Sequence, residues 1–274
     1  MTAEKITLTG VKETLLITLY GKGEESRLTG SLLRDRFAAE VIGRIDYDFS
    51  KLQVGRDDMV GLATRAYRFD QCARAFIAAH PDAIVLHLGC GLDSRIFRLD
   101  PPATVRWFDV DYPEVIALRH RLYPAQAAGT MIGSSVTDPS WLDTIPADAP
   151  ALIIAEGLLM YLSEAEVGDL LGALTTRLPG GELVFDGFNR LGIRLAQSNR
   201  MIKATGATLN WNIDEPRELE VLVPKLRFVA ELMIYDPAEA AQFRRFSLPA
   251  RLAIRVMHAV PGFRRIGRLL RYRF

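Results

Sequence analysis

The sequence is poor in features that define several classes of protein. It has two cysteines, Cys72 and Cys90, among 274 residues; these are too few for a disulfide framework, and reduced thiols in a cytoplasmic protein are expected. Basic and acidic residues nearly balance, 34 against 33, so there is no global electrostatic attraction to nucleic acid. No basic segment followed by an apolar one stands at the N-terminus, and no signal peptide is predicted.

Long apolar runs are also scarce. The longest, residues 151–162, is interrupted by Glu156 and is too short to span a bilayer. The remaining composition, 49% apolar and 24% charged, is that of an ordinary globular protein with a sizeable core. A chain of this length can form one large α/β domain.

The hydrophobic pattern changes near residue 80. Residues 1–80 predict a helical cap that belongs to the same domain, with helices at 31–45 and 57–79. The glycines at 21, 23 and 30 predict a loop before the first of these helices.

From residue 81 to 274 short apolar runs alternate with helical patterns, which predicts βαβ units and a parallel sheet covered on both faces. Strands are expected at 84–88, 105–110, 130–134, 151–155, 182–186, 228–235 and 269–274, and helices are expected to start near Ser94, Pro113, Pro139 and Ser163. The predicted fold is a doubly wound, mostly parallel, seven-stranded Rossmann-like α/β sheet, with an insertion around 187–225.

A strand, a glycine turn and a helix follow one another in residues 84–95, Ile-Val-Leu-His-Leu-Gly-Cys-Gly-Leu-Asp-Ser-Arg. Gly89 and Gly91 allow a sharp turn and a close approach of a ligand to the main chain. Asp109 and Asp111 end the next strand, where nucleotide-binding folds hold the acid that binds ribose hydroxyls. The turn therefore predicts a nucleoside-containing ligand, with a tight turn of an unrelated α/β protein as the alternative.

Two positions of this turn bear on which ligand it takes. Dinucleotide sites prefer a third glycine, but here that position is Ser94, and Asp93 would repel a pyrophosphate. A cationic sulfonium ligand without phosphates tolerates both residues. An NAD-dependent oxidoreductase is the less favoured alternative.

Glu156 directly follows the apolar run 151–155, at the edge of the sheet where open α/β folds bind ligands. A charge there costs free energy unless it is paired. A cationic ligand group or a protein cation could be that partner, and the sequence leaves both open.

Three motifs carry a family resemblance: Gly-Cys-Gly-Leu-Asp-Ser-Arg at 89–95, Trp-Phe-Asp-Val-Asp-Tyr-Pro-Glu-Val at 107–115 and Ala-Glu-Gly-Leu-Leu-Met-Tyr-Leu at 155–162. In order and spacing they resemble the leucine carboxyl methyltransferase and TcmP-like O-methyltransferase family. Residues 13–16, 45–49 and 211–216 look closer to the polyketide branch than to the protein-methylating one.

The resemblance implies a class I methyltransferase fold, S-adenosylmethionine as cofactor, and ester or ether formation at an oxygen. It implies that Arg65 pairs with the methionyl carboxylate and that Glu156 accepts from the amino group. The other implied cofactor-binding residues are the glycine turn Gly89, Cys90 and Gly91, the ribose-side acids Asp109 and Asp111, and, near the adenine, Ser135 and Val136. Ser135 stands where the family often has an aspartate, and its hydroxyl can still bond the base.

The acceptor is open between a carboxylate and a hydroxyl. A carboxylate is already ionised at neutral pH, whereas a phenol needs a general base. The four histidines are scattered, and His87 is expected to be a packed core residue, which favours a carboxylate and no metal. Residues that could position the acceptor are Tyr161, Asn189, Arg190, Arg194 and Arg200; for the arginines, a solvated helix face is the alternative.

Nine arginines and no acid occur between Arg244 and Phe274. Attraction to anionic lipid or to an acidic partner is one interpretation, but pairing with acids elsewhere is preferred because the whole chain is nearly neutral. The expected partner is a small-molecule substrate, with neither nucleic acid nor a membrane surface, and the protein is a monomer or a homo-oligomer. Methylation of a protein C-terminal carboxylate and a non-catalytic S-adenosylmethionine-binding module remain alternatives.

Overall fold

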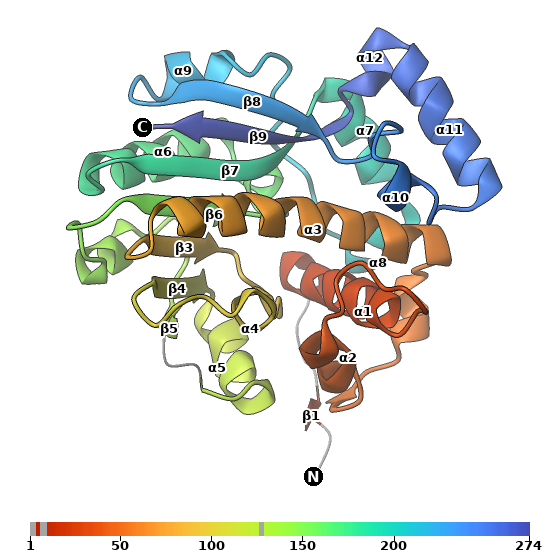
Figure 1. Cartoon of the computed structure of the whole chain (residues 1–274), viewed down its shortest axis with the longest axis horizontal. Coiled ribbons are helices and arrows are strands. Elements are labelled where there is room, and N and C mark those ends of the chain that lie inside the picture. The colour runs from red at the N-terminus through yellow and green to blue at the C-terminus, as the bar shows by residue number, and fades with distance from the viewer. Residues whose placement is uncertain (1–3, 6–9, 126–128) are drawn as a thin grey trace.

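Seven strands form one mixed sheet at the centre of the computed structural model, which describes residues 4–5, 10–125 and 129–274 (Figure 1). The strand order is β5-β4-β3-β6-β7-β9-β8, and β9 is antiparallel to both of its neighbours while the other pairs are parallel. The strands are β3 (Ile84–Leu88), β4 (Arg106–Asp111), β5 (Gly129–Gly133), β6 (Ala151–Ala155), β7 (Gly181–Phe188), β8 (Arg227–Met233) and β9 (Gly267–Arg273). The predicted seven-stranded, mostly parallel sheet is confirmed.

Helices cover both faces of this sheet. The main helices are α1 (Thr14–Ser26), α2 (Arg36–Ile42), α3 (Arg56–Ala79), α4 (Arg95–Leu99), α5 (Pro113–Leu122), α6 (Glu164–Arg177), α7 (Arg190–Ser198), α8 (Arg200–Thr205), α9 (Glu218–Leu222), α10 (Ala240–Phe243), α11 (Leu248–Ala259) and α12 (Pro261–Arg264). The 3-10 turns are η1 (Gly10–Glu13), η2 (Phe49–Leu52), η3 (Pro139–Thr144) and η4 (Leu159–Tyr161), and β1 (Glu4–Lys5) pairs with β2 (Ile45–Asp46).

Local sequence signals explain where several helices begin. Ser163 and Glu166 form a reciprocal capping box at the start of α6, and Pro113 occupies the first turn of α5. The strands β3 and β6 are buried along their whole length, because helices lie on both faces of the sheet. This double burial is why these strands read as continuous apolar runs.

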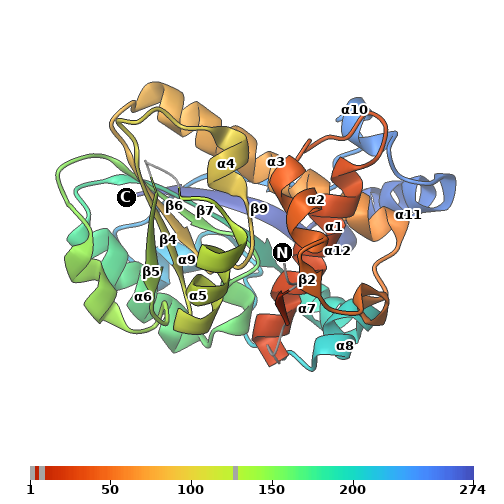
Figure 2. The same cartoon turned by 90° about the horizontal axis from the view of Figure 1, so that it is seen from below.

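Among the described residues, the core has two small clusters beside α3 and three large parts. One lies between the sheet and α6 with α9, a second between the sheet and α3 with α4, and a third joins α1, α2 and α5. Figure 2 shows α3 and α4 on one side of the sheet and α6 on the other, with α1 and α2 beyond one end of the strands. The chain leaves β3 toward β4 and β5 and then returns to β6, so the switch point lies between β3 and β6. Ligands bind at the carboxyl ends of the strands at such a point.

The glycine-based prediction of a loop is confirmed at Gly30, which lies between α1 and α2, but is wrong at Gly21 and Gly23, which lie inside α1. A Cβ at Gly21 would lie 2.4 Å from Leu62 Cδ1 in α3, and one at Gly23 would lie 2.3 Å from Ile42 Cδ1 in α2. These glycines therefore let three helices pack closely. The expected helix at 31–45 is confined to α2, and the element starting at Pro139 is the 3-10 turn η3.

The arginine-rich C-terminal segment is largely paired with acids from other parts of the chain. Arg245, Arg265, Arg268, Arg271 and Arg273 form ion pairs with Glu25, Glu182, Glu215 or Glu231. Both cysteines are buried free thiols. Within the part of the chain that is described, no helix is both long and apolar enough to cross a bilayer.

Candidate functional site

A large cavity lies at the carboxyl ends of β3, β4 and β6, between the sheet and α1. Its volume is about 300 Å³, at the lower end of the roughly 300–1,000 Å³ of small-molecule pockets. We call it the main cavity. Its walls come from the turn after β3, the end of β4, the segment 156–161 after β6, and helices α1, α3 and α8.

The glycine turn forms one wall through its main chain. Gly89 has φ +59° and Gly91 has φ +51°, a left-handed conformation that L side chains rarely adopt. A Cβ at Gly89 would lie 2.9 Å from Leu158 Cδ1, and one at Gly91 would lie 3.2 Å from Leu15 Cβ. The glycines thus open the backbone to a ligand, while Cys90 between them is buried.

Asp111 ends β4 and faces the main cavity. Its Oδ2 accepts the Gly91 N–H at 2.7 Å, and its Oδ1 accepts the Tyr112 N–H at 2.7 Å. A carboxylate offers about four acceptor positions, so each oxygen keeps one for a ligand. Burial raises the pKa of Asp111 above its usual value, and the carboxylate forms no ion pair with any described residue.

Asp109 lies on the same face of β4, two residues deeper. Its side chain accepts the Trp107 indole N–H at 2.9 Å and pairs with Arg119 Nη2 at 2.5 Å. Its exposure is 2% and it does not line the main cavity. The two aspartates that the sequence places together therefore have different surroundings.

Glu156 sits at the bottom of the main cavity among three cations. Lys22 Nζ lies 3.0 Å from its Oε1, Arg65 Nε lies 3.2 Å from the same oxygen, and Arg95 bonds its Oε2. Burial alone would raise the pKa of Glu156, but these three cations hold it below its usual value. In the structure the partners of this acid are therefore protein cations.

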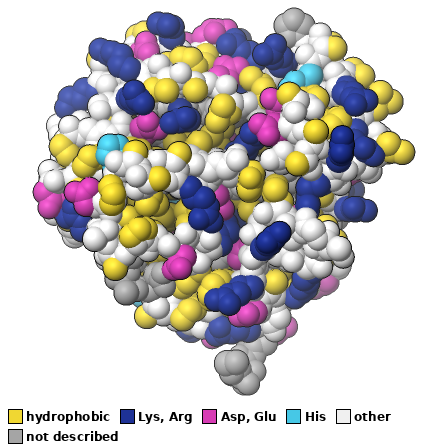
Figure 3. All heavy atoms as spheres, viewed as in Figure 1, with side chains coloured by type: hydrophobic (Ala, Val, Ile, Leu, Met, Phe, Trp, Pro, Cys, Tyr) yellow, Lys and Arg dark blue, Asp and Glu magenta, His cyan; other side chains and the backbone are white. Residues whose placement is uncertain are grey.

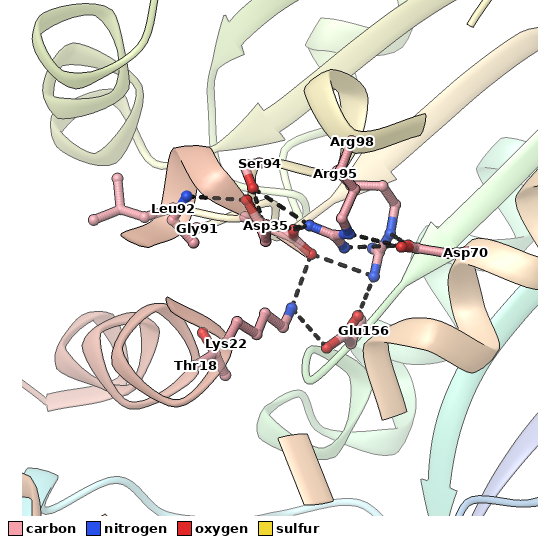
Figure 4. A network of polar contacts seen from close by, with 12 residues as sticks. Thr18, Lys22, Asp35, Asp70, Gly91, Leu92, Ser94, Arg95, Arg98 and Glu156 are labelled. Carbon is pink, nitrogen blue, oxygen red and sulfur yellow. Dashed lines mark hydrogen bonds and ion pairs between the residues drawn. The ribbon is translucent and has the colours of Figure 1, made fainter. Parts of the chain in front are cut away.

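These contacts belong to a larger group of buried charges, shown in Figure 4. We call it the buried ion cluster; its members are Lys22, Asp35, Asp70, Asp93, Arg95, Arg98 and Glu156. Lys22 Nζ reaches Asp93 Oδ2 at 2.9 Å, Arg95 Nε reaches Asp70 Oδ1 at 2.8 Å, and Arg98 Nη1 reaches Asp35 Oδ2 at 2.8 Å. The members come from α1, the N-cap of α2, α3, α4, the turn after β3 and the end of β6. The cluster therefore joins the N-terminal helices to the glycine turn and to β6.

Arg65 and Asp186 extend this cluster along the cavity wall. Arg65 Nη1 donates to Asp186 Oδ2 at 3.0 Å, and Asp186 Oδ1 accepts the Gly157 N–H at 2.6 Å. Burial raises the pKa of Asp186. Arg65 also lines the main cavity, so its guanidinium is held in place by two acids beside the ligand space.

Sequence reasoning missed Lys22 and Asp186. Lys22 stands between two glycines in a segment that reads as a loop, and only the helix α1 turns it inward. Asp186 is the last residue of the strand predicted at 182–186. Because β6 and β7 are parallel neighbours, an acid at this strand end lies next to Glu156, and the sequence could have indicated it on that ground.

The proposed acceptor-positioning residues separate into two groups. Tyr161 lines the main cavity, and burial raises the pKa of its phenol. Asn189 instead caps α7, with its Oδ1 accepting the Gly192 N–H at 2.7 Å. The arginines point to solvent: Arg190 pairs weakly with Asp214 at 3.6 Å, Arg200 bonds Asp58 at 2.9 Å, and Arg194 is exposed. These three arginines therefore agree with the alternative given for them, a helix face exposed to solvent.

Ser135 and Val136 follow β5, beside the strand that carries Asp111. Ser135 Oγ bonds Thr137 Oγ1 at 2.8 Å, and Val136 packs into the core. Neither residue lines the main cavity.

The sequence model of the family described as leucine carboxyl methyltransferase matches residues 25–175. A relative from Streptomyces glaucescens, "Tetracenomycin polyketide synthesis O-methyltransferase TcmP", is 46% identical over 99% of both chains. The chain belongs to the leucine carboxyl methyltransferase family. A second family relative, an S-adenosyl-L-methionine-dependent methyltransferase from Gibberella zeae, is 34% identical over 84% of both chains.

Membership of the leucine carboxyl methyltransferase family makes the protein an O-methyltransferase that uses S-adenosylmethionine, as the sequence motifs predicted. Solved structures agree with this at the level of the fold. A crystal structure from Thermobifida fusca, described as a candidate methyltransferase, aligns with a TM-score of 0.61 at 17% identity, over 86% of this chain and 92% of that one. The class I methyltransferase fold is confirmed.

Proposed function

We propose that this enzyme methylates a carboxylate of a small aromatic or polyketide-like acid and forms a carboxyl methyl ester. The observation that carries the proposal is the chemistry of the cavity walls. Near Tyr161 and Arg65 the main cavity offers hydrogen-bond donors, and both ring nitrogens of His87, the one imidazole among the described residues that line it, are already engaged. A carboxylate needs no base, because it is ionised at neutral pH.

His87 is the one imidazole among the described residues lining the main cavity. Its Nε2 lies 3.1 Å from Arg95 Nη1, and its Nδ1 lies 3.0 Å from Asp109 Oδ1. Because an arginine only donates, Nε2 is the acceptor and the proton sits on Nδ1. The imidazole therefore has no nitrogen left to take a proton from an acceptor.

The cofactor site is proposed from the same walls. Asp111 would bind the ribose hydroxyls through its two remaining acceptor positions, and Gly89, Cys90 and Gly91 would border the methionyl part. Glu156 would receive the amino group, and Arg65 would pair with the methionyl carboxylate. Asp109 would not touch the cofactor; through its bonds to Trp107 and Arg119 it would fix the position of β4, which carries Asp111. Ser135 and Val136 would border the adenine.

The charge of the site supports this assignment. The buried ion cluster with Arg65 and Asp186 holds four cations and five carboxylates, and Asp111 adds another acid. S-adenosylmethionine carries one net positive charge and, when bound, supplies an electrophilic methyl group on its sulfonium. A site with excess carboxylate attracts such a ligand.

The chain's own part in the reaction is to align and to dehydrate. Tyr161 would donate to one carboxylate oxygen and leave the other free to attack in line. The apolar residues Leu158, Met160 and Phe188 exclude water from that space. We propose that the helical region 1–80 and the insertion around 187–225 shape the acceptor side.

The test is to identify the bond formed. The protein is incubated with S-[methyl-¹⁴C]adenosylmethionine and a series of aromatic carboxylic acids beside the matching phenols. A methyl ester releases labelled methanol in mild base, whereas a methyl ether does not. Base-labile product from the acids alone is expected; base-stable product from the phenols would contradict the proposal.

A further inference from the structure

Large apolar side chains are exposed along one face of α11 and continue onto α12. Helix positions four residues apart lie on the same face, and the members from α11 and its C-cap follow this spacing. We call the set the exposed stripe; it consists of Leu248, Leu252, Val256, Val260 and Phe263, which are 73, 64, 58, 43 and 41% exposed. Large apolar side chains gathered on a surface in this way mark a site of interaction.

The opposite face of α11 holds the helix to the rest of the protein. Ile254 is buried there and packs with Val60 of α3 and with Phe243 and Phe246, which precede α11. The exposed stripe takes no part in this buried cluster. The folding of α11 onto the protein therefore does not explain why its outer face is apolar.

Four arginines without acidic partners surround the exposed stripe. Arg251 and Arg255 each follow a leucine of the stripe by three positions, which makes them its neighbours on the helix surface. Arg244 precedes α11, and Arg264 ends α12. The ion pairs that the segment from Arg244 to Phe274 forms with described residues all belong to its other five arginines, and the segment contains no acid. The apolar stripe is thus bordered by uncompensated positive charge.

This surface stands at one end of the molecule. Figures 1 and 2, which share the horizontal long axis, both show α11 at the right-hand end. Figure 3 shows hydrophobic side chains at this edge with basic side chains beside them. A helix at the tip of the molecule can lie flat on an extended surface, because the rest of the fold does not stand in between.

Protein partners match this surface less well than a lipid surface does. An isologous contact with a second copy sets the patch against itself and would bring the unpaired arginines of both copies together at a cost in free energy. Leucine and valine, four of the five members of the exposed stripe, are under-represented among the residues that dominate binding between proteins. Acyl chains accept any apolar side chain, and headgroup phosphates accept the arginine N–H groups.

We propose that α11 and α12 form a peripheral binding site for an anionic lipid surface. The exposed stripe enters the boundary between headgroups and acyl chains, and the four unpaired arginines contact lipid phosphates at the level of the headgroups. The near-neutral charge of the whole chain does not oppose this contact, since charges farther than about 8–10 Å away are screened. This inference goes beyond the proposed function and does not depend on it.

The sequence favoured arginines paired with acids and no membrane partner. That expectation holds for the five paired arginines of the segment. It does not describe the four unpaired ones, which lie together beside the exposed stripe only because α11 and α12 adjoin in the fold.

The experiment is sedimentation of the protein with sucrose-loaded vesicles, made either of phosphatidylcholine alone or of equal parts phosphatidylcholine and phosphatidylglycerol. We expect binding to the mixed vesicles, much weaker binding to the neutral ones, and a decrease in binding as salt is added. Leu252→Glu places a negative charge within the exposed stripe and should weaken partition at least about tenfold. Val221→Glu, the same kind of change at a position on α9 that is 83% exposed, is the matched control and should leave partition unchanged.

The electrostatic part is tested by Arg255→Gln, with Arg217→Gln at the start of α9 as its control. Both arginines are exposed, and neither forms an ion pair with a described residue. One arginine close to an anionic surface contributes about fivefold to the partition coefficient. Arg255→Gln should lose this factor, whereas Arg217→Gln should not.

Absence of wild-type binding to the mixed vesicles, or equal partition of Leu252→Glu and Val221→Glu, would overturn the proposal. Binding to poly-L-glutamate without binding to vesicles would overturn it in favour of an acidic protein. Self-association that Leu252→Glu abolishes, again without vesicle binding, would overturn it in favour of a second copy. All four variants replace exposed side chains, and far-ultraviolet circular dichroism establishes that each is folded before partition is compared.

Discussion

Replacing Lys22 by methionine removes one cation from the buried ion cluster, so Asp93 and Glu156 each lose an ion-pair partner. Lys22 is 3% exposed, and its Nζ bonds Asp93 and Glu156. Removing one partner of a buried pair costs about 3–5 kcal/mol. Since Arg95 still contacts both acids, we expect a loss near the lower end, about 3 kcal/mol of the free energy of unfolding.

The assay is urea unfolding at several pH values, with Lys12→Met as the control. Lys12 forms an ion pair with Glu114 at the surface, where removal costs less than about 1 kcal/mol. The pKa of Glu156 is lower in the folded protein than in the unfolded chain, where it is about 4.5. The ionised Glu156 therefore contributes to the free energy of unfolding above about pH 4.5, and this contribution is lost as the pH falls through the pKa of the folded state. The loss of unfolding free energy in Lys22→Met should therefore be complete at pH 7 and should become smaller below about pH 4.5. A deficit no larger than that of Lys12→Met would refute the reasoning.

Two further predictions concern the strands and the turn beneath the site. Gly89→Ala should lower the free energy of unfolding by about 1–2 kcal/mol, because φ is +59° and the new Cβ meets Leu158; Gly43→Ala, whose nearest contact is 3.5 Å away, should change it little in the same urea assay. Burial would raise the pKa of Asp109, but its partners, Arg119 first among them, lower this pKa from 3.8 to about 2. The ionised Asp109 therefore contributes to the free energy of unfolding above about pH 4, and this contribution is lost as the pH falls toward 2. The difference between wild type and Asp109→Asn in acid titration should shrink by about 2 kcal/mol over that range; a constant difference would contradict the assignment.

Much of the fold could be predicted from the sequence, because burial on both faces makes the strands continuous apolar runs. The turn at Gly89 and Gly91 and the acids at Asp111 and Glu156 could be located, since each directly follows a strand. The carboxyl ends of parallel strands meet at one edge, and the structure brings these residues, with Arg65, to one cavity.

The rest depends on packing that local sequence does not encode. Gly21 and Gly23 resemble loop residues until the close approach of α2 and α3 is known. Which way an arginine of α7 or α8 points depends on how these helices dock, and Arg190 and Arg200 face solvent for that reason.

Calorimetric titration of S-adenosylhomocysteine tests the proposed cofactor site most directly. The variant is Asp111→Ala, and the control is Asp148→Ala, whose side chain is 68% exposed. Hydrogen bonds to a charged group contribute about 1.5–3 kcal/mol, so losing the carboxylate should weaken binding by about ten- to a hundredfold. Micromolar binding to wild type and to Asp148→Ala, weakened by this factor in Asp111→Ala, is the predicted result. Equal affinity in all three proteins would contradict the account.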